Sequence, residues 1–212
     1  MDIASKIVEM SVTLPAVLLA ITFHEYAHGW VANRLGDPTA RLMGRLTLNP
    51  ISHLDPIGAL ALLVFNVGWA KPVPVNSFYL RNPKRDMVWI ATAGPAINLF
   101  LAASSAMVFR MMEGMRIPTY PPQADWLLEP IFRMVYWSVV INVALAVFNI
   151  IPIPPLDGGR ILAGILPREQ ALAYSRIEPY GFVILLGLIF TGVVGMVIWP
   201  AISVVTHVLL RA

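Results

Sequence analysis

Four apolar stretches, each about as long as a bilayer-crossing helix, dominate the sequence. They cover residues 7–31, 87–111, 131–150 and 180–200. A helix needs about 20 mainly apolar residues to cross the hydrocarbon core of a membrane. The 212-residue chain is 58% hydrophobic and only 13% charged, which is outside the usual range of water-soluble domains. We therefore expect an all-α integral membrane protein, a single domain over residues 1–212, with about four full transmembrane helices.

The segments between these spans carry further structural signals. A fifth apolar stretch, 57–69, is too short to span comfortably and lies between Pro56 and Pro72, so we expect a re-entrant or interfacial segment. Residues 40–50 alternate apolar and polar side chains, which predicts a short strand or hairpin, a small β element on the cytoplasmic side. The proline-punctuated residues 70–76 are expected to be extended.

The distribution of basic residues predicts an orientation. Residues 32–86 and 151–179 share one side of a four-span topology and hold ten of the 15 lysines and arginines. Cytoplasmic loops carry an excess of Lys and Arg, so this side should be cytoplasmic and both termini should lie opposite. The basic residues are scattered between apolar segments, and we expect no nucleic-acid partner. The chain has no cysteine, which excludes disulfides.

The first span carries an unusual set of ionisable residues in "FHEYAHGW" (23–30). His24 and His28 are four residues apart and therefore share one face of a helix. Two imidazoles so placed can hold one Zn²⁺, and Glu25 beside them can act as general base on a zinc-activated water. Ionisable residues inside a membrane are costly and usually functional. The motif therefore predicts a metal site near the cytoplasmic end of this span.

A catalytic zinc normally has three protein ligands, so the chain must supply one more. The next glutamate after Glu25 is Glu113, and the position six residues after His28 is an arginine, so neither usual continuation of the motif fits. Asp157 in "NIIPIPPLDGGRIL" (149–162) ends a later span on the same side, where prolines break the helix and glycines permit close approach. Alone, this stretch also fits a helix-ending turn. Because the zinc motif on the first span lacks a third ligand, Asp157 is the best candidate for that ligand.

Taken together, "FHEYAHGW" and "NIIPIPPLDGGRIL" resemble the site-2 protease family of intramembrane zinc metalloproteases. The segments "NPISHLDPIG", "GWAKPVPVN", "RNPKRDM", "ATAGPAINLF" and "EPYGFVILL" look like its compact bacterial and archaeal branch, without PDZ or CBS domains. The resemblance covers nearly the whole chain. It implies one zinc per chain held by His24, His28 and Asp157, with Glu25 as the catalytic base.

The resemblance also implies partners and a location. The substrate would be a transmembrane protein or peptide, cleaved in or beside its membrane-spanning segment, and the lipid bilayer would surround the enzyme. We expect the plasma membrane of a prokaryote, with the active site toward the cytoplasm. A homo-oligomer is left open.

Two further polar residues are candidates for the site. Asn98 in "GPAINLF" lies early in an apolar span, where it would contact the oxyanion or the substrate, or else make a helix–helix hydrogen bond. His53 would support the site or bind substrate, or else bond locally with Asp55 or the backbone. Asn142 and Asn149 share a helix face and are expected to pack or support rather than bind metal.

Three other functions are compatible with parts of the sequence. A metal-ion transporter does not need a general-base glutamate, and transport sites often lie between repeated halves, of which the sequence shows none. A catalytically silent membrane scaffold would not need the full set of catalytic residue types. A CAAX-type membrane protease would take a glutamate as third ligand, and Glu169 and Glu178 are weaker candidates than Asp157. The leading hypothesis is therefore an intramembrane zinc endopeptidase.

Overall fold

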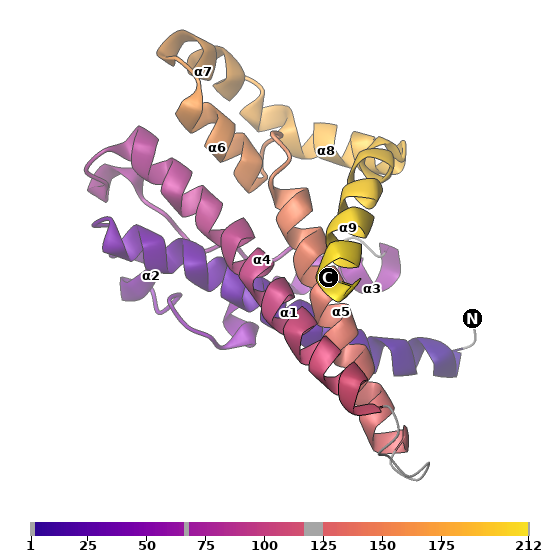
Figure 1. Ribbon diagram of the computed structural model, residues 1–212. Helices are drawn as coiled ribbons and strands as arrows, with labels where there is room; N and C mark the ends of the chain where they lie inside the picture. Colours follow the sequence, from indigo (N-terminus) through magenta and orange to yellow (C-terminus); the bar gives the residue numbers. More distant parts are fainter. Residues whose placement is uncertain (1–2, 66–67, 117–124, 212) are drawn as a thin grey trace.

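The computed structural model describes residues 3–65, 68–116 and 125–211, and within them the protein is all-helical (Figure 1). The predicted fold class is thus confirmed at the level of helix content. No strand is found in these described ranges. The one β pairing there is an isolated antiparallel bridge between Leu54 and Ala70.

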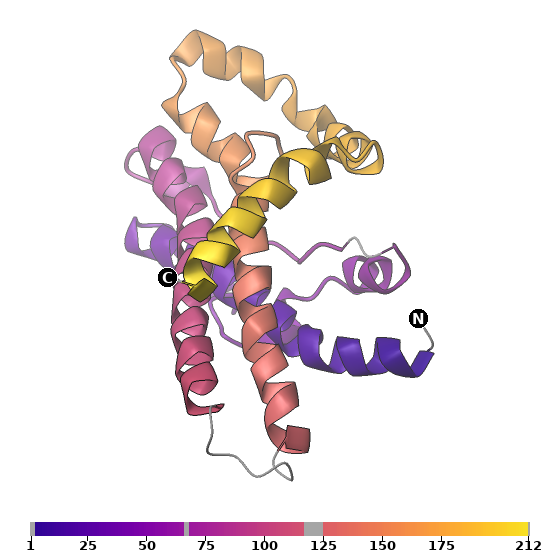
Figure 2. The ribbon, with the colours of Figure 1, turned by 45° about the vertical axis from the view of Figure 1, so that its right-hand side comes forward.

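Three long helices form the centre of the molecule. They are α1 (Ile3–Arg34), α4 (Pro83–Arg116) and α5 (Asp125–Asn149). The second half of α1 lies alongside the first half of α4, and α5 runs beside α4 (Figures 1 and 2). Small residues at the contacts let the helix backbones approach closely. The buried alanines of these helices are Ala16, Ala20, Ala32, Ala91, Ala102, Ala106 and Ala146.

Short elements connect α1 to α4. They are α2 (Thr39–Leu42), η1 (Pro50–His53), α3 (Pro56–Phe65) and η2 (Ser77–Tyr79). The short apolar stretch after Pro56 is thus helical as α3, and residues 66–67 of the predicted segment lie outside the described residues.

The strand or hairpin predicted for residues 40–50 is not found. The Asp37 carboxylate accepts hydrogen bonds from the backbone N–H and the hydroxyl of Thr39, which favours a helical turn at that point. The chain then turns through Gly44, at φ +64°, and runs irregularly to η1. Alternation of apolar and polar residues therefore does not produce a strand here, because no second strand lies beside this segment in the described part of the chain. Residues 71–76, expected to be extended, form neither helix nor strand.

The C-terminal part contains α6 (Asp157–Ile165), α7 (Arg168–Ser175), η4 (Glu178–Tyr180), α8 (Gly181–Phe190) and α9 (Val193–Arg211). The prediction of one span over 180–200 is wrong, because α8 ends at Phe190, with Thr191 as its C-cap, and Gly192 turns the chain with a φ of +76°. From there α9 returns along α4 and α5 (Figures 1 and 2). Ile198 and Ile202 of α9 share a buried cluster with residues of both helices.

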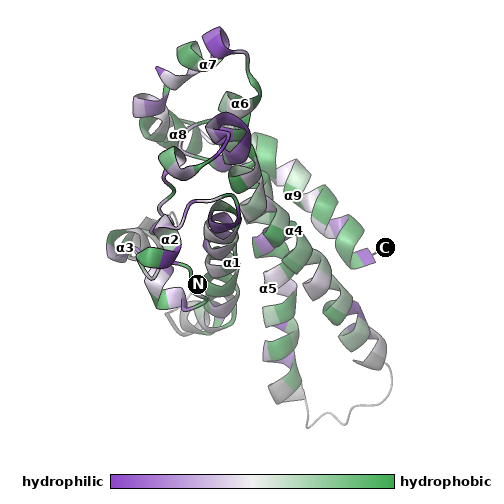
Figure 3. Cartoon of the chain, turned by 90° about the vertical axis from the view of Figure 1, so that its left-hand side faces the viewer, coloured by the Kyte–Doolittle hydropathy of each residue, from purple (hydrophilic) through white to green (hydrophobic). Residues whose placement is uncertain are grey.

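The predicted count of four spans is not confirmed. Among the described residues, five stretches are long and apolar enough to cross a membrane, namely Val8–Arg34, Pro83–Gly114, Leu128–Asn149, Arg168–Phe190 and Val193–Arg211. The fourth combines α7, η4 and α8, and a ten-residue helix such as α8 rises only about 15 Å, half the thickness of the hydrocarbon core. Hydrophobic residues dominate α5 and α9, and hydrophilic ones gather toward α6 and α7 (Figure 3).

Candidate metal centre

Two imidazoles on α1 are held in one orientation by α4. The Nδ1 atom of His24 lies 2.6 Å from Oδ1 of Asn98, and the Nδ1 atom of His28 lies 2.6 Å from the carbonyl oxygen of Ile90. Each partner atom is an acceptor, so each Nδ1 carries the proton and donates it. Both histidines therefore present an unprotonated Nε2 on the opposite side of the ring, in the form that binds metal.

The two Nε2 atoms converge with one oxygen of Asp157. They lie 3.0 Å from each other, and Oδ2 of Asp157 lies 3.0 Å from that of His24 and 3.2 Å from that of His28. Asp157 Oδ2 is buried and has no hydrogen-bond donor in the described part of the chain. Three electron-pair donors facing one another repel unless a cation lies between them.

The geometry of this cluster suits zinc. In a tetrahedral site with bonds of about 2.0–2.1 Å, neighbouring ligand atoms are about 3.3 Å apart, close to the separations found here. All three side chains are buried, and they form the one group of three metal-binding side chains found among the described residues.

Glycines bring the backbone of α4 and α6 close to this cluster. A Cβ atom at Gly94 would lie 2.5 Å from both Cε1 of His24 and Nε2 of His28, so a larger residue cannot occupy this position without displacing the imidazoles. At the start of α6, a Cβ at Gly158 would collide with the carbonyl oxygens of Ile150 and Ile151. The proline-containing loop before α6 therefore folds back tightly and places Asp157 opposite the histidines.

Glu25 lies next to the cluster and is half-buried. Its Oε2 accepts a hydrogen bond of 2.7 Å from the backbone N–H of Val73, in the irregular segment before η2. The sequence singled out the carboxylate, but its backbone partner is separated from it by 48 residues and has no sequence signal.

Asn98 is fully buried at the contact of α1, α4 and α5. Besides bonding His24, its Nδ2 donates to the carbonyl oxygen of Ala20 (3.1 Å) and to Oδ1 of Asn142 (2.8 Å). Asn142 in turn donates to the carbonyl oxygen of Ser138. Both N–H bonds of the Asn98 amide are therefore used by protein oxygens, and its Oδ1 orients His24. This geometry corresponds to the second alternative considered from the sequence, a helix–helix hydrogen bond.

His53 is fully buried and bonds to the backbone of its own connecting segment. Its Nε2 lies 2.8 Å from the carbonyl oxygen of Thr47, and its own carbonyl accepts from the N–H of Lys71. Asp55 bonds the N–H of Gly58, so the predicted local partner of His53 is the backbone. Within the described part of the chain, His53 makes no hydrogen bond or ion pair with the metal-binding group.

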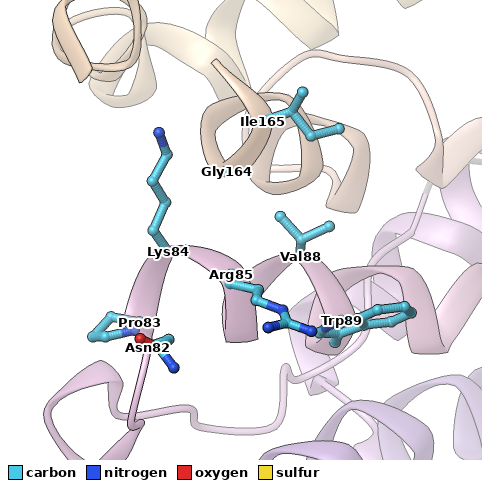
Figure 4. A pocket seen from close by; sticks show the side chains of 8 residues that line it. All are labelled: Asn82, Pro83, Lys84, Arg85, Val88, Trp89, Gly164 and Ile165. Carbon is cyan, nitrogen blue, oxygen red and sulfur yellow. The ribbon is translucent and has the colours of Figure 1, made fainter. Parts of the chain in front are cut away.

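A separate cavity of about 640 Å³ lies between the start of α4 and the end of α6 (Figure 4). It is lined by Asn82, Pro83, Lys84, Arg85, Val88, Trp89, Gly164 and Ile165. None of the three converging metal-binding residues lines it, so it is distinct from the candidate metal centre.

A buried His–His–Asp group at the contact of apolar helices, with a carboxylate beside it, defines the class of membrane zinc metalloproteases. Comparison with known families agrees, since the model of peptidase family M50 matches residues 12–126 and 122–192. The chain belongs to peptidase family M50, the site-2 proteases, and it is a zinc metalloprotease of the intramembrane type.

Curated relatives carry zinc metalloprotease names, which for the first two are provisional. YwhC of Bacillus subtilis is 37% identical over 187 residues, which cover 88% of this chain and 84% of YwhC. Rip2 of Mycolicibacterium smegmatis is 29% identical over 183 residues, covering 82% of this chain and 64% of Rip2. MJ0392 of Methanocaldococcus jannaschii is 24% identical over 159 residues, which cover 75% of this chain and 35% of MJ0392. No solved structure matches the chain.

Proposed function

We propose that the protein hydrolyses a peptide bond in or near a transmembrane segment of a membrane-protein substrate, with one zinc ion held by His24, His28 and Asp157. The observation that carries the proposal is the convergence of two unprotonated Nε2 atoms and a buried carboxylate oxygen within about 3 Å of one another. His24 and His28 lie on α1, which is long and apolar enough to cross a membrane, and the family consists of membrane-embedded zinc metalloproteases.

Each side chain has a distinct role in this proposal. When bound, zinc polarises the scissile carbonyl and lowers the pKa of the attacking water. Glu25 takes the proton of that water and returns it to the leaving amide nitrogen. Asn98 and the Ile90 carbonyl hold the imidazoles with Nε2 toward the ion.

The membrane setting places a demand on the substrate. Carbonyl groups of a transmembrane helix are bonded to N–H groups four residues along, so the helix must open before it can be attacked. Substrates with Gly, Pro or Asn near the scissile bond should therefore be cleaved faster than versions carrying Leu there. Seven of the 15 lysines and arginines lie in residues 32–86, directly after the first span, and this excess supports a site near the cytoplasmic face of a prokaryotic plasma membrane.

The experiment compares Glu25→Gln with the wild type on a panel of single-span substrates in liposomes, and measures zinc content in parallel. Glutamine keeps the side-chain size but cannot take the proton, so cleavage should fall by about 10²–10⁴-fold while zinc is retained. His207→Gln, at an exposed position on α9, is the matched control and should cleave normally.

Cleavage by Glu25→Gln at the wild-type rate would reject the general-base role. Zinc flux across the liposome in place of cleavage would reject the protease and favour a transporter.

A further inference from the structure

The segment 71–76, "KPVPVN", is attached to α1 and the turn after it by two carboxylates. The N–H of Val73 donates to Oε2 of Glu25, and the N–H of Asn76 donates to Oδ2 of Asp37, each over 2.7 Å. Asp37 is fully buried, and its other oxygen is bonded by Thr39. Because its hydrogen bonds are satisfied, this buried carboxylate is a firm anchor for one end of the segment.

The other end of the segment is fixed as well. Nη2 of Arg45 donates to the carbonyl oxygen of Lys71 over 2.8 Å, and the N–H of Lys71 donates to the carbonyl of His53. Between these anchors the side chain of Val73 is buried against Gly29 of α1, where an added Cβ would lie 3.0 Å from Cγ1 of Val73. Val73 is therefore fixed by the anchored residues before and after it in the chain and by its packing against Gly29.

From this arrangement we infer that the backbone N–H of Val73 is a positioning group for Glu25, an inference that rests on the proposed role of Glu25 as general base. A glutamate side chain has several rotatable bonds, and fixing them at the moment of reaction costs entropy. The bond to Val73 fixes Oε2 in advance. It leaves Oε1, which has no hydrogen bond within the described residues, to take the proton.

The local sequence makes Val73 a selective donor. Pro72 and Pro74 have no N–H, so Val73 supplies the one backbone donor of these three residues. The next donor, the N–H of Val75, has no hydrogen-bond partner in the described part of the chain. The two prolines also restrict the segment before folding, which lowers the entropy lost on fixing it.

The functional test uses two substitutions at one position. Val73→Pro removes the N–H, whereas Val73→Ala trims the same packing but keeps the N–H. A displacement of about 1 Å at a reacting group costs up to about 100-fold in rate, so Val73→Pro should lower kcat by about 10–100-fold. KM and zinc content should be unchanged, and Val73→Ala should keep kcat within about 3-fold. Equal losses in both variants would show that packing alone matters and would overturn the inference.

A second measurement examines the bond directly and does not depend on activity or on the folding of Val73→Pro. Amide hydrogen exchange is followed at Val73 and Val75 in the wild type and in Glu25→Ala. The Val73 amide should exchange at least 10-fold more slowly than that of Val75 in the wild type, and should lose this protection in Glu25→Ala. Equal exchange at the two positions in the wild type would overturn the inference.

The outcomes separate this inference from the proposed function. If cleavage does not depend on Glu25, the proposed function fails whatever Val73 does. If cleavage depends on Glu25 but Val73→Pro keeps the wild-type kcat, the positioning role alone fails.

Discussion

Gly94 and Gly158, near the metal centre, and Gly187 and Gly195, within α8 and α9, occupy opposite environments, although both pairs stand in apolar sequence. At Gly94 and Gly158 an added Cβ would collide with neighbouring atoms. At Gly187 and Gly195 it would meet nothing within 4 Å. The first pair lies where helix backbones press on one another and on the imidazoles, whereas α8 and α9 leave these positions open on the apolar outer surface. Hydropathy alone does not distinguish the two regions.

Polar side chains show the same division. The centre buries two histidines, two amides and a carboxylate, and hydrogen bonds fix both imidazoles and link three helices. In α8 and α9 the buried side chains are Leu185, Ile198 and Ile202. Unpaired polar groups are costly in an apolar interior. A buried polar network at the metal centre and none in α8 and α9, as far as these helices are described, therefore indicates that the functional site lies at the metal centre.

Gly94→Ala should have the largest effect among substitutions that test this contrast. Its Cβ would displace both His24 and His28, so purified protein should lose most of its zinc and its cleavage activity, as measured by atomic absorption and by substrate cleavage. The matched control is Gly187→Ala on α8. Normal zinc content in Gly94→Ala would show that α1 and α4 can move apart without loss of the metal site. It would contradict the claim that glycine is required at Gly94.

Asn98→Leu should have the next largest effect. It removes the acceptor that orients His24 and leaves Asn142 with an unused oxygen. Loss of a group that orients a metal ligand typically costs about 10–100-fold in metal affinity, which a chelator competition would measure. Ser104→Ala, which removes an exposed hydroxyl from the same helix, serves as control. An unchanged zinc affinity in Asn98→Leu would argue that the network is structural only.

Gly192→Ala should affect stability without affecting the metal. Gly192 has a φ of +76°, which costs an L-residue about 1–2 kcal/mol, so the melting temperature should fall while zinc content stays constant. Loss of zinc in this variant would show that the break between α8 and α9 is coupled to the centre.

Gly187→Ala should have the smallest effect. In mid-helix and open space, alanine is favoured over glycine by up to about 1 kcal/mol, so stability should stay equal or rise slightly. A clear fall in melting temperature would reveal a contact on this face of α8.

The sequence predicted the parts of the centre that depend on side-chain chemistry. The spacing of His24 and His28 and the missing third ligand were enough to suggest Asp157, and the structure brings the three together. The Ile90 carbonyl and the Val73 N–H could not be predicted, because every residue has these groups and only tertiary packing selects one. The break at Gly192 was missed because glycine within an apolar run is also common in continuous membrane helices.

The most direct test of the metal centre is zinc content and zinc X-ray absorption on purified wild-type protein and Asp157→Ala. The wild type should hold one zinc per chain with imidazole nitrogen and carboxylate oxygen at about 2.0–2.1 Å, and Asp157→Ala should bind less zinc and lose the carboxylate contribution. Full zinc occupancy in Asp157→Ala with an unchanged coordination shell would contradict the account.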